Sequence, residues 1–267
     1  MTEPTPAHSS RRAYLGAVAS AGIALAAGCL GSDGDDRYEN VVLDEPEQYA
    51  MLREARDEGD VGYPIYGDEL PQFDAPCTLR DRDVTPAEFD GDRHTMYTFV
   101  FTRCHGACPG LVSGLRHVQA DSVDEGYADD VGFLTVTFDP EYDTPDVLEE
   151  YGHDLGVEYD LDNWYFLRPE TEEDAQHLVE EQFGCYFARN PDYEGEDEHG
   201  HGHDEDDHEH GDDDHDEDDE NGMEMAFEHE SMIVLANADG YVERTYVGQV
   251  PTPDTLIDDA RTLVERW

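Results

Sequence analysis

The sequence predicts an α/β fold in which a central mixed sheet is flanked by helices. Two apolar, β-branched runs, residues 94–102 and 131–139, are typical of buried strands. Each run is followed by a stretch with apolar residues at helical spacing. The chain then closes with a hairpin pattern over residues 231–248 and a helical pattern over residues 252–267. Strands that alternate with helices in this way favour a layered α/β architecture.

The elements follow in chain order from the first long strand. The helix predicted after Thr144 has Pro145 in its first turn and Gly156 beyond its end. The hairpin is predicted around residues 238–240, Ala-Asp-Gly. This order is that of a thioredoxin-like sandwich. The predicted helices are 108–122, 144–156, 171–184 and 252–267, and the other predicted strands are 163–169 and 185–189.

Residues 1–28 have the pattern of an export signal. Paired arginines at 11 and 12 precede an apolar run over residues 15–27, which is too short to span a bilayer of about 30 Å. Small residues directly before Cys29 predict lipoprotein cleavage and a lipid on Cys29, and an uncleaved N-terminal anchor is the alternative. Both interpretations place the protein outside, anchored to the outer face of the cytoplasmic membrane.

Two further segments differ in composition from the folded part. Residues 29–64 are acidic and poor in apolar residues, apart from a short helical pattern over residues 48–58, and are predicted to be a tether. The domain is predicted to cover residues 65–267. It is interrupted by residues 194–222, which hold six histidines, seventeen carboxylates and no large apolar residue. Because no apolar burial offsets the entropy of ordering it, this insertion is predicted to be a disordered loop.

The charge of the chain excludes some partners. The formal net charge is −53, and the sequence contains no lysine. Such a surface repels nucleic acid and anionic lipid headgroups, so neither is an expected partner. Dense carboxylates without lysine are typical of extreme halophiles, where molar salt shortens the screening length to about 3 Å. We interpret the acidity as an adaptation to salt.

Cys104 and Cys108 are the main candidates for chemistry. They lie between a predicted strand and a helix that starts at Pro109, and the positive end of that helix favours thiolates. Thiolates attack disulfides and also bind metals, so a redox couple and a metal site are both open. Three intervening residues let both sulfurs converge on one ion. His229, directly before an apolar strand, is the candidate third ligand.

The other cysteines and histidines give weaker signals. Cys77 and Cys185 are compatible with either a disulfide or two buried, unpaired thiols. The histidines of the insertion, with Met223 and Met225 after them, are candidates for metal capture, and an incidental halophilic insertion is the alternative. These secondary candidates are His199, His201, His203, His208, His210 and His215.

Three stretches together resemble the Sco (SenC) family of copper-delivery proteins. They are "FTRCHGACPG", "TFDPEYDTPDVLEEY" and "HESMIVLANADG", in the family's order. The resemblance covers roughly residues 65–267 outside the insertion. It implies a thioredoxin-like fold on which Cys104, Cys108 and His229 bind copper. It also implies that Asp139 supports the ligands or contacts a partner.

The resemblance has two departures. His105-Gly106 follow the first cysteine, where the family usually has Pro-Asp, so His105 is either an extra ligand or a solvated loop residue. Glu230 follows the metal histidine in place of Ser or Thr, which bears on how the imidazole is oriented.

The preferred function is that of an exported copper metallochaperone, a carrier rather than an enzyme. Two thiolates and one imidazole suit Cu(I) and can hold Cu(II), whereas structural zinc normally has a fourth protein ligand. By resemblance, the client is the dinuclear copper centre of a terminal oxidase or a related respiratory copper enzyme. One alternative is a thiol-disulfide reductase that uses Cys104 and Cys108 to keep the client's cysteines reduced. Another is an extracytoplasmic metal buffer based on the insertion.

Overall fold

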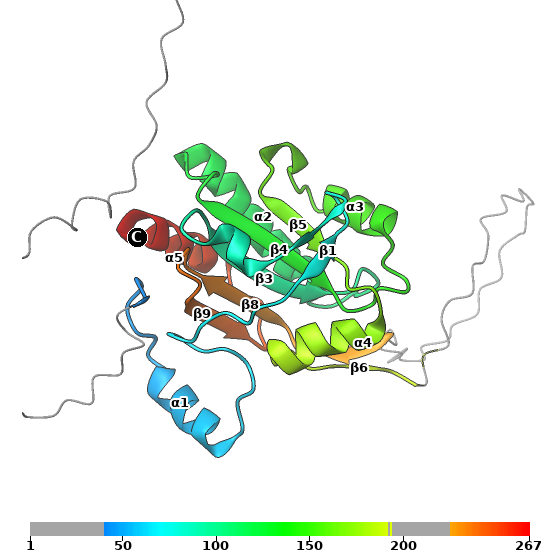
Figure 1. Ribbon diagram of the computed structural model, residues 1–267, viewed down its shortest axis with the longest axis horizontal. Helices are drawn as coiled ribbons and strands as arrows, with labels where there is room; N and C mark the ends of the chain where they lie inside the picture. The colour runs from blue at the N-terminus through cyan, green and yellow to red at the C-terminus, as the bar shows by residue number, and fades with distance from the viewer. Residues whose placement is uncertain (1–39, 192, 194–224) are drawn as a thin grey trace, which may run out of the picture. The chain divides into compact units, whose positions relative to one another are not determined.

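The computed structural model describes residues 40–191, 193 and 225–267 (Figure 1). The export signal, Cys29, the six histidines of the insertion and Met223 lie outside these residues, so the predictions about them stay predictions. No helix in the described part is long and apolar enough to cross a bilayer. The helices are α1 (Tyr49–Glu58), η3 (Pro86–Phe89), α2 (Cys108–Glu125), α3 (Pro145–Asp154), η4 (Tyr159–Leu161), α4 (Glu172–Ala175), η5 (Gln176–Gln182) and α5 (Pro253–Arg266). The strands are β1 (Ala75–Cys77), β2 (Arg82–Val84), β3 (His94–Val100), β4 (Val131–Thr137), β5 (Trp164–Leu167), β6 (Phe187–Arg189), β7 (Phe227–His229), β8 (Met232–Ala236) and β9 (Val242–Val247).

Among the described residues, a seven-stranded sheet has the order β2-β1-β5-β4-β3-β8-β9. Strands β3, β4 and β5 are mutually parallel, whereas β8 pairs antiparallel with both β3 and β9. Strands β6 and β7 form a separate antiparallel pair. Helices α2 and α5 pack against each other, and Figure 1 shows them side by side. The predicted α/β fold with a central mixed sheet is therefore confirmed.

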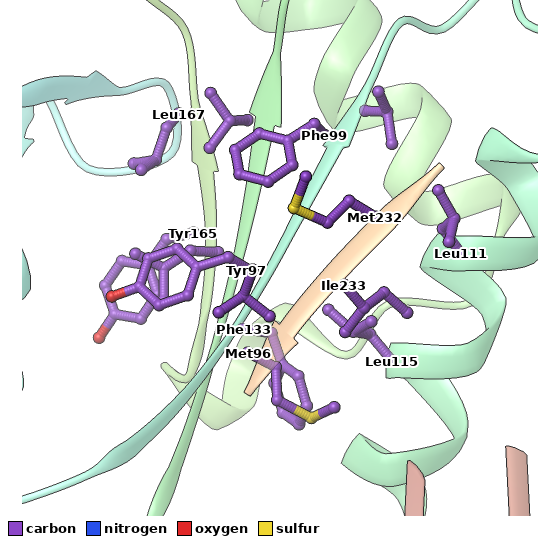
Figure 2. Packing of buried hydrophobic residues seen from close by; sticks show 14 of the residues in the cluster. Met96, Tyr97, Phe99, Leu111, Leu115, Phe133, Tyr165, Leu167, Met232 and Ile233 are labelled. Carbon is purple, nitrogen blue, oxygen red and sulfur yellow. The ribbon is translucent and has the colours of Figure 1, made fainter. Parts of the chain in front are cut away.

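The core lies on both faces of the sheet. All seven residues of β3 are buried, and successive side chains point to opposite faces. On one face, the rings of Tyr97 and Phe99 lie 5.5 Å and 5.0 Å from the ring of Phe183. On the other, Leu111 and Leu115 of α2 point toward the sheet at Ile233 (Figure 2). This packing holds the C-terminal end of β3 and the N-terminal end of α2 in fixed positions.

Some elements differ from the prediction in form. The helix expected over residues 171–184 begins with an α-helical turn, α4, which Thr171 and Asp174 cap reciprocally. It continues as the π-helix η5, a form that the periodicity does not distinguish from an α-helix. The strands β1, β2 and β7 have three residues each and were not predicted.

Residues 40–64 lie in the same compact unit as the sheet, whereas the sequence predicted a tether up to residue 64. The helical pattern appears as α1, with Tyr49 buried. The buried carboxylate of Glu243 accepts hydrogen bonds from the backbone N–H groups of Val42 and Leu43, at 2.8 Å and 2.9 Å. A few well-placed apolar side chains and one distant carboxylate fix this segment, and its acidic average composition does not reveal them.

Buried His94 makes the stability of the fold depend on pH. Its Nδ1 accepts the backbone N–H of Ala238 at 3.1 Å, and its ring packs against Trp267. Burial lowers the pKa of His94 to about 4. The unfolded chain takes up this proton near pH 6.5. In the folded protein, His94 stays neutral down to about pH 4. The contribution of this group to the free energy of unfolding is therefore complete above pH 6.5 and is lost as the pH falls from 6.5 to about 4.

We therefore expect unfolding free energy to fall by about 3 kcal/mol through this group between pH 6.5 and pH 4. His94→Asn keeps an acceptor without the titration. Urea unfolding in molar salt across this range should give a smaller pH slope for the variant, while all other groups contribute equally to both proteins. Equal slopes would contradict the assignment.

Candidate metal centre

The two cysteines of the candidate site lie at the junction between β3 and α2. Cys108 is the first residue of α2, and Pro109, which has no N–H to satisfy, occupies the first turn. Cys104 lies in the turn before it. Both cysteines are buried, at 2% and 0% exposure. The fully buried β3 and the apolar face of α2 thus place two thiols at the positive end of a helix.

The third side chain comes from a distant part of the chain. His229 is the last residue of β7 and pairs with Phe187 of β6. Its ring packs edge-on against Phe101, at 5.4 Å and 85°, and lies 5.5 Å from the ring of Phe138. These aromatic contacts restrict the imidazole to one orientation, facing the cysteines.

The structure brings Cys104, Cys108 and His229 together. Nε2 of His229 lies 3.5 Å from Sγ of Cys104 and 3.9 Å from Sγ of Cys108. All three potential ligand atoms lie within 4.8 Å of one another. In the described part of the chain, this is the one group of three or more Cys, His, Asp or Glu side chains close enough to share an ion.

The backbone determines which nitrogen of His229 faces the sulfurs as a ligand. Nδ1 lies 3.1 Å from the carbonyl oxygen of Glu230, and a carbonyl can only accept, so Nδ1 carries the hydrogen. Nε2 of the neutral ring is then the free electron-pair donor. Burial alone would lower the pKa of His229, but the hydrogen bonds with Cys104 and the Glu230 carbonyl outweigh it and raise that pKa.

The two thiols are not equivalent. Hydrogen bonding from Cys108 lowers the pKa of Cys104, with further contributions from His229 and from the N–H of Gly106, which lies 3.4 Å from Sγ. The hydrogen bond to Cys104 and burial raise the pKa of Cys108. Cys104 therefore loses its proton more readily than Cys108, and an ion held by both sulfurs would require the Cys108 proton to leave.

Asp139 lies beside the site without touching its three potential ligands. It is 1% exposed, and its Oδ2 lies 2.5 Å from Nη2 of Arg103, the residue before Cys104. Its Oδ1 lies 3.6 Å from Nη2 of Arg189. No local sequence pattern connects either arginine with Asp139, so these contacts could not be predicted from the sequence. The predicted role of Asp139 stays a prediction.

The remaining candidates lie apart from this group. His105 is exposed and is not one of its members. Cys77 and Cys185 are both buried free thiols. Of the two alternatives predicted for them, the structure shows the unpaired thiols and not the disulfide. The thiol of Cys185 donates to the carbonyl of Glu230 at 3.5 Å, the same carbonyl that His229 uses. No sequence pattern indicated this contact.

The donor set fits a soft cation. Two sulfurs and one imidazole nitrogen match Cu(I), and the imidazole allows Cu(II) as well. A structural zinc site would normally have four protein ligands. With three, the coordination shell is incomplete, and an incoming ligand from another molecule can complete it.

Comparisons with known proteins identify chains of similar sequence. The family model described as SCO1/SenC matches residues 71–204. The SCO1 protein homolog of Bacillus subtilis (strain 168) is 23% identical over 190 residues, which are 70% of this chain and 80% of that protein.

Solved structures are similar in fold. The SCO1/SenC family lipoprotein from Bacillus anthracis str. Ames has a TM-score of 0.53 at 19% identity, over 73% of this chain and 95% of that one. Arabidopsis thaliana ScoI with copper bound has a TM-score of 0.53 at 18% identity, over 75% of this chain and 100% of that one. Yeast Sco1 with copper bound has a TM-score of 0.53 at 17% identity, over 75% of this chain and 91% of that one. These likenesses support the thioredoxin-like fold predicted from the sequence.

Proposed function

Because this chain belongs to the SCO1/SenC family, we propose that it is a copper metallochaperone. It binds one copper ion through Cys104, Cys108 and His229 and delivers it to a respiratory copper enzyme. The observation that carries the proposal is the convergence of two buried sulfurs and one imidazole nitrogen within 4.8 Å.

The relatives support both the metal and the client. Arabidopsis and yeast relatives have been solved with copper bound. A further similar structure, BsSco, is described as a member of the Sco family of cytochrome c oxidase assembly proteins, with a TM-score of 0.51 and 20% identity. We therefore propose the dinuclear copper centre of a terminal oxidase as the client. The pattern of residues 1–28 supports export and anchoring to the outer face of the membrane.

The geometry supports an ordered uptake of copper as cargo. The Cys104 thiolate attracts the cation first. Cys108 then gives up its proton, and Nε2 of His229 binds without any change of tautomer because Nδ1–H is held by the Glu230 carbonyl. Delivery reverses these steps when ligands of the client enter the open position.

The test is a Cu(I) titration of the reduced full chain in detergent and molar salt. We expect one tight equivalent in the unaltered protein and its loss in Cys104→Ser and Cys108→Ser. Cys77→Ala, which removes a buried thiol outside the site, is the matched control and should keep the equivalent. Tight binding that survives both serine variants and disappears on deletion of residues 194–222 would instead support a metal buffer.

The thiol pair itself supports a second candidate function, thiol-disulfide exchange. The pKa of Cys104 is lowered, which is typical of an attacking thiol. The BsSco structure is also described in terms of a disulfide switch. Absence of tight copper binding, together with a readily reversible Cys104–Cys108 disulfide, would favour this reductase function.

A further inference from the structure

The thioether of Met225 lies next to the candidate copper site. A methyl group placed on the Cα of Gly106 would lie 3.8 Å from Sγ of Cys104 and 3.8 Å from Sδ of Met225. The two sulfurs therefore flank the same backbone position and are separated by at most twice that distance. Because residue 106 is glycine, it contributes no side chain to the space between them.

The backbone that carries this thioether is held in place. The side-chain amide of Asn190 donates to the carbonyl of Met225 at 3.3 Å, and the backbone N–H of Asn190 donates to the carbonyl of Ala226 at 2.9 Å. Met225 precedes His229 by four residues and packs against the core while remaining partly exposed. Its three rotatable bonds allow Sδ to swing toward Cys104 although the backbone is fixed.

The chemistry of a thioether suits the fourth position of this site. It is a soft donor that prefers Cu(I), and it is neutral, so it adds no negative charge to two buried cysteines. Cys104 and Cys108 are almost inaccessible, whereas Met225 is only half-buried. A ligand in this position connects the buried sulfurs with the surface.

We propose that Sδ of Met225 is a fourth ligand for Cu(I), the one through which the ion enters and leaves the Cys104–Cys108–His229 group. The inference rests on the proposed copper function and deepens it. It assigns a role to a residue outside the Cys/Cys/His group.

The direct test observes the thioether. The full chain, labelled with ¹³C at its methionine methyl groups, is titrated anaerobically with one equivalent of Cu(I) in molar salt. The methyl resonance of Met225, identified by its absence from the spectrum of Met225→Leu, should shift when Cu(I) is added. The resonance of Met51, which is 64% exposed on α1, should not.

Affinity measured by competition with a Cu(I) chelator gives an independent readout. Met225→Leu should weaken Cu(I) binding roughly tenfold, the lower end of the effect of losing a supporting contact at a metal site. Met51→Leu is the matched control and should bind normally. Gly106→Ala removes no donor but places its methyl between the two sulfurs, and Gly106 does not have a left-handed backbone, so alanine can adopt its conformation. Gly106→Ala should therefore also weaken Cu(I) binding, as Met225→Leu does.

The outcomes separate this inference from the proposed function. An unshifted Met225 methyl with normal affinity in Met225→Leu, while Cys108→Ser still abolishes binding, would overturn the inference and leave the chaperone function standing. No tight Cu(I) binding by the unaltered protein would overturn the proposed function, and the inference with it.

Discussion

Replacing His229 with alanine is expected to weaken Cu(I) binding by at least about a hundredfold, the upper end of the effect of losing even a supporting contact at a metal site. The substitution removes the nitrogen that lies 3.5 Å and 3.9 Å from the two sulfurs. Both cysteine sulfurs remain, so the ion is still held but without its nitrogen ligand. The measurement is chelator competition on the reduced protein, and His153→Ala, which alters an exposed histidine on α3, is the control.

The same variant distinguishes a chaperone from a reductase. Thiol-disulfide exchange needs only the thiols, so His229→Ala should still exchange, but more slowly at neutral pH. The reason is that the contact with His229 helps to lower the pKa of Cys104, and its loss reduces the thiolate fraction. A variant that binds copper normally would show that His229 is not a ligand. One that still matures its client would favour the reductase.

The second large effect concerns stability. Gly184→Ala should lower the free energy of unfolding by roughly 4 kcal/mol, from a left-handed backbone and a steric collision together. Gly184 has a φ of +67°, and an added Cβ would lie 2.5 Å from the backbone of Gly62 and Tyr63. Backbone atoms cannot rotate away as a side chain can, so the chain at residues 62–63 would have to move.

A matched control separates the two contributions. Gly91 has a φ of +73° and open space around it, so Gly91→Ala should cost only about 1 kcal/mol from conformation alone. Urea unfolding in molar salt measures both variants. Equal losses would mean that residues 62–63 yield easily, and would contradict the close packing of the segment before residue 65 on the domain.

The parts of the fold that could be predicted are those with long, regular patterns. Strands β3 and β4 are seven-residue buried runs, and α5 is amphipathic over its whole length. Short strands such as β7 have no period to detect. The contact of Glu243 with Val42 and Leu43 joins residues about two hundred positions apart, so composition alone assigned that segment to a tether.

In the candidate site, too, some residues could be predicted from the sequence and others could not. Spacing and the strand-to-helix setting identified Cys104 and Cys108, and the position of His229 before an apolar strand identified the third side chain. The surrounding contacts could not be found in this way. Arg103 meets Asp139, and Met225 approaches Cys104, only because the sheet brings separate segments together.

The carbonyl of Glu230 has a consequence for how this site can change in evolution. It accepts hydrogen bonds from Nδ1 of His229 and from the thiol of Cys185, and both use the main chain rather than the side chain of residue 230. Any amino acid presents the same carbonyl, so mutations at position 230 are uncoupled from the orientation of the imidazole. Selection for an acidic surface could therefore place glutamate beside a metal ligand and leave that ligand's geometry unchanged.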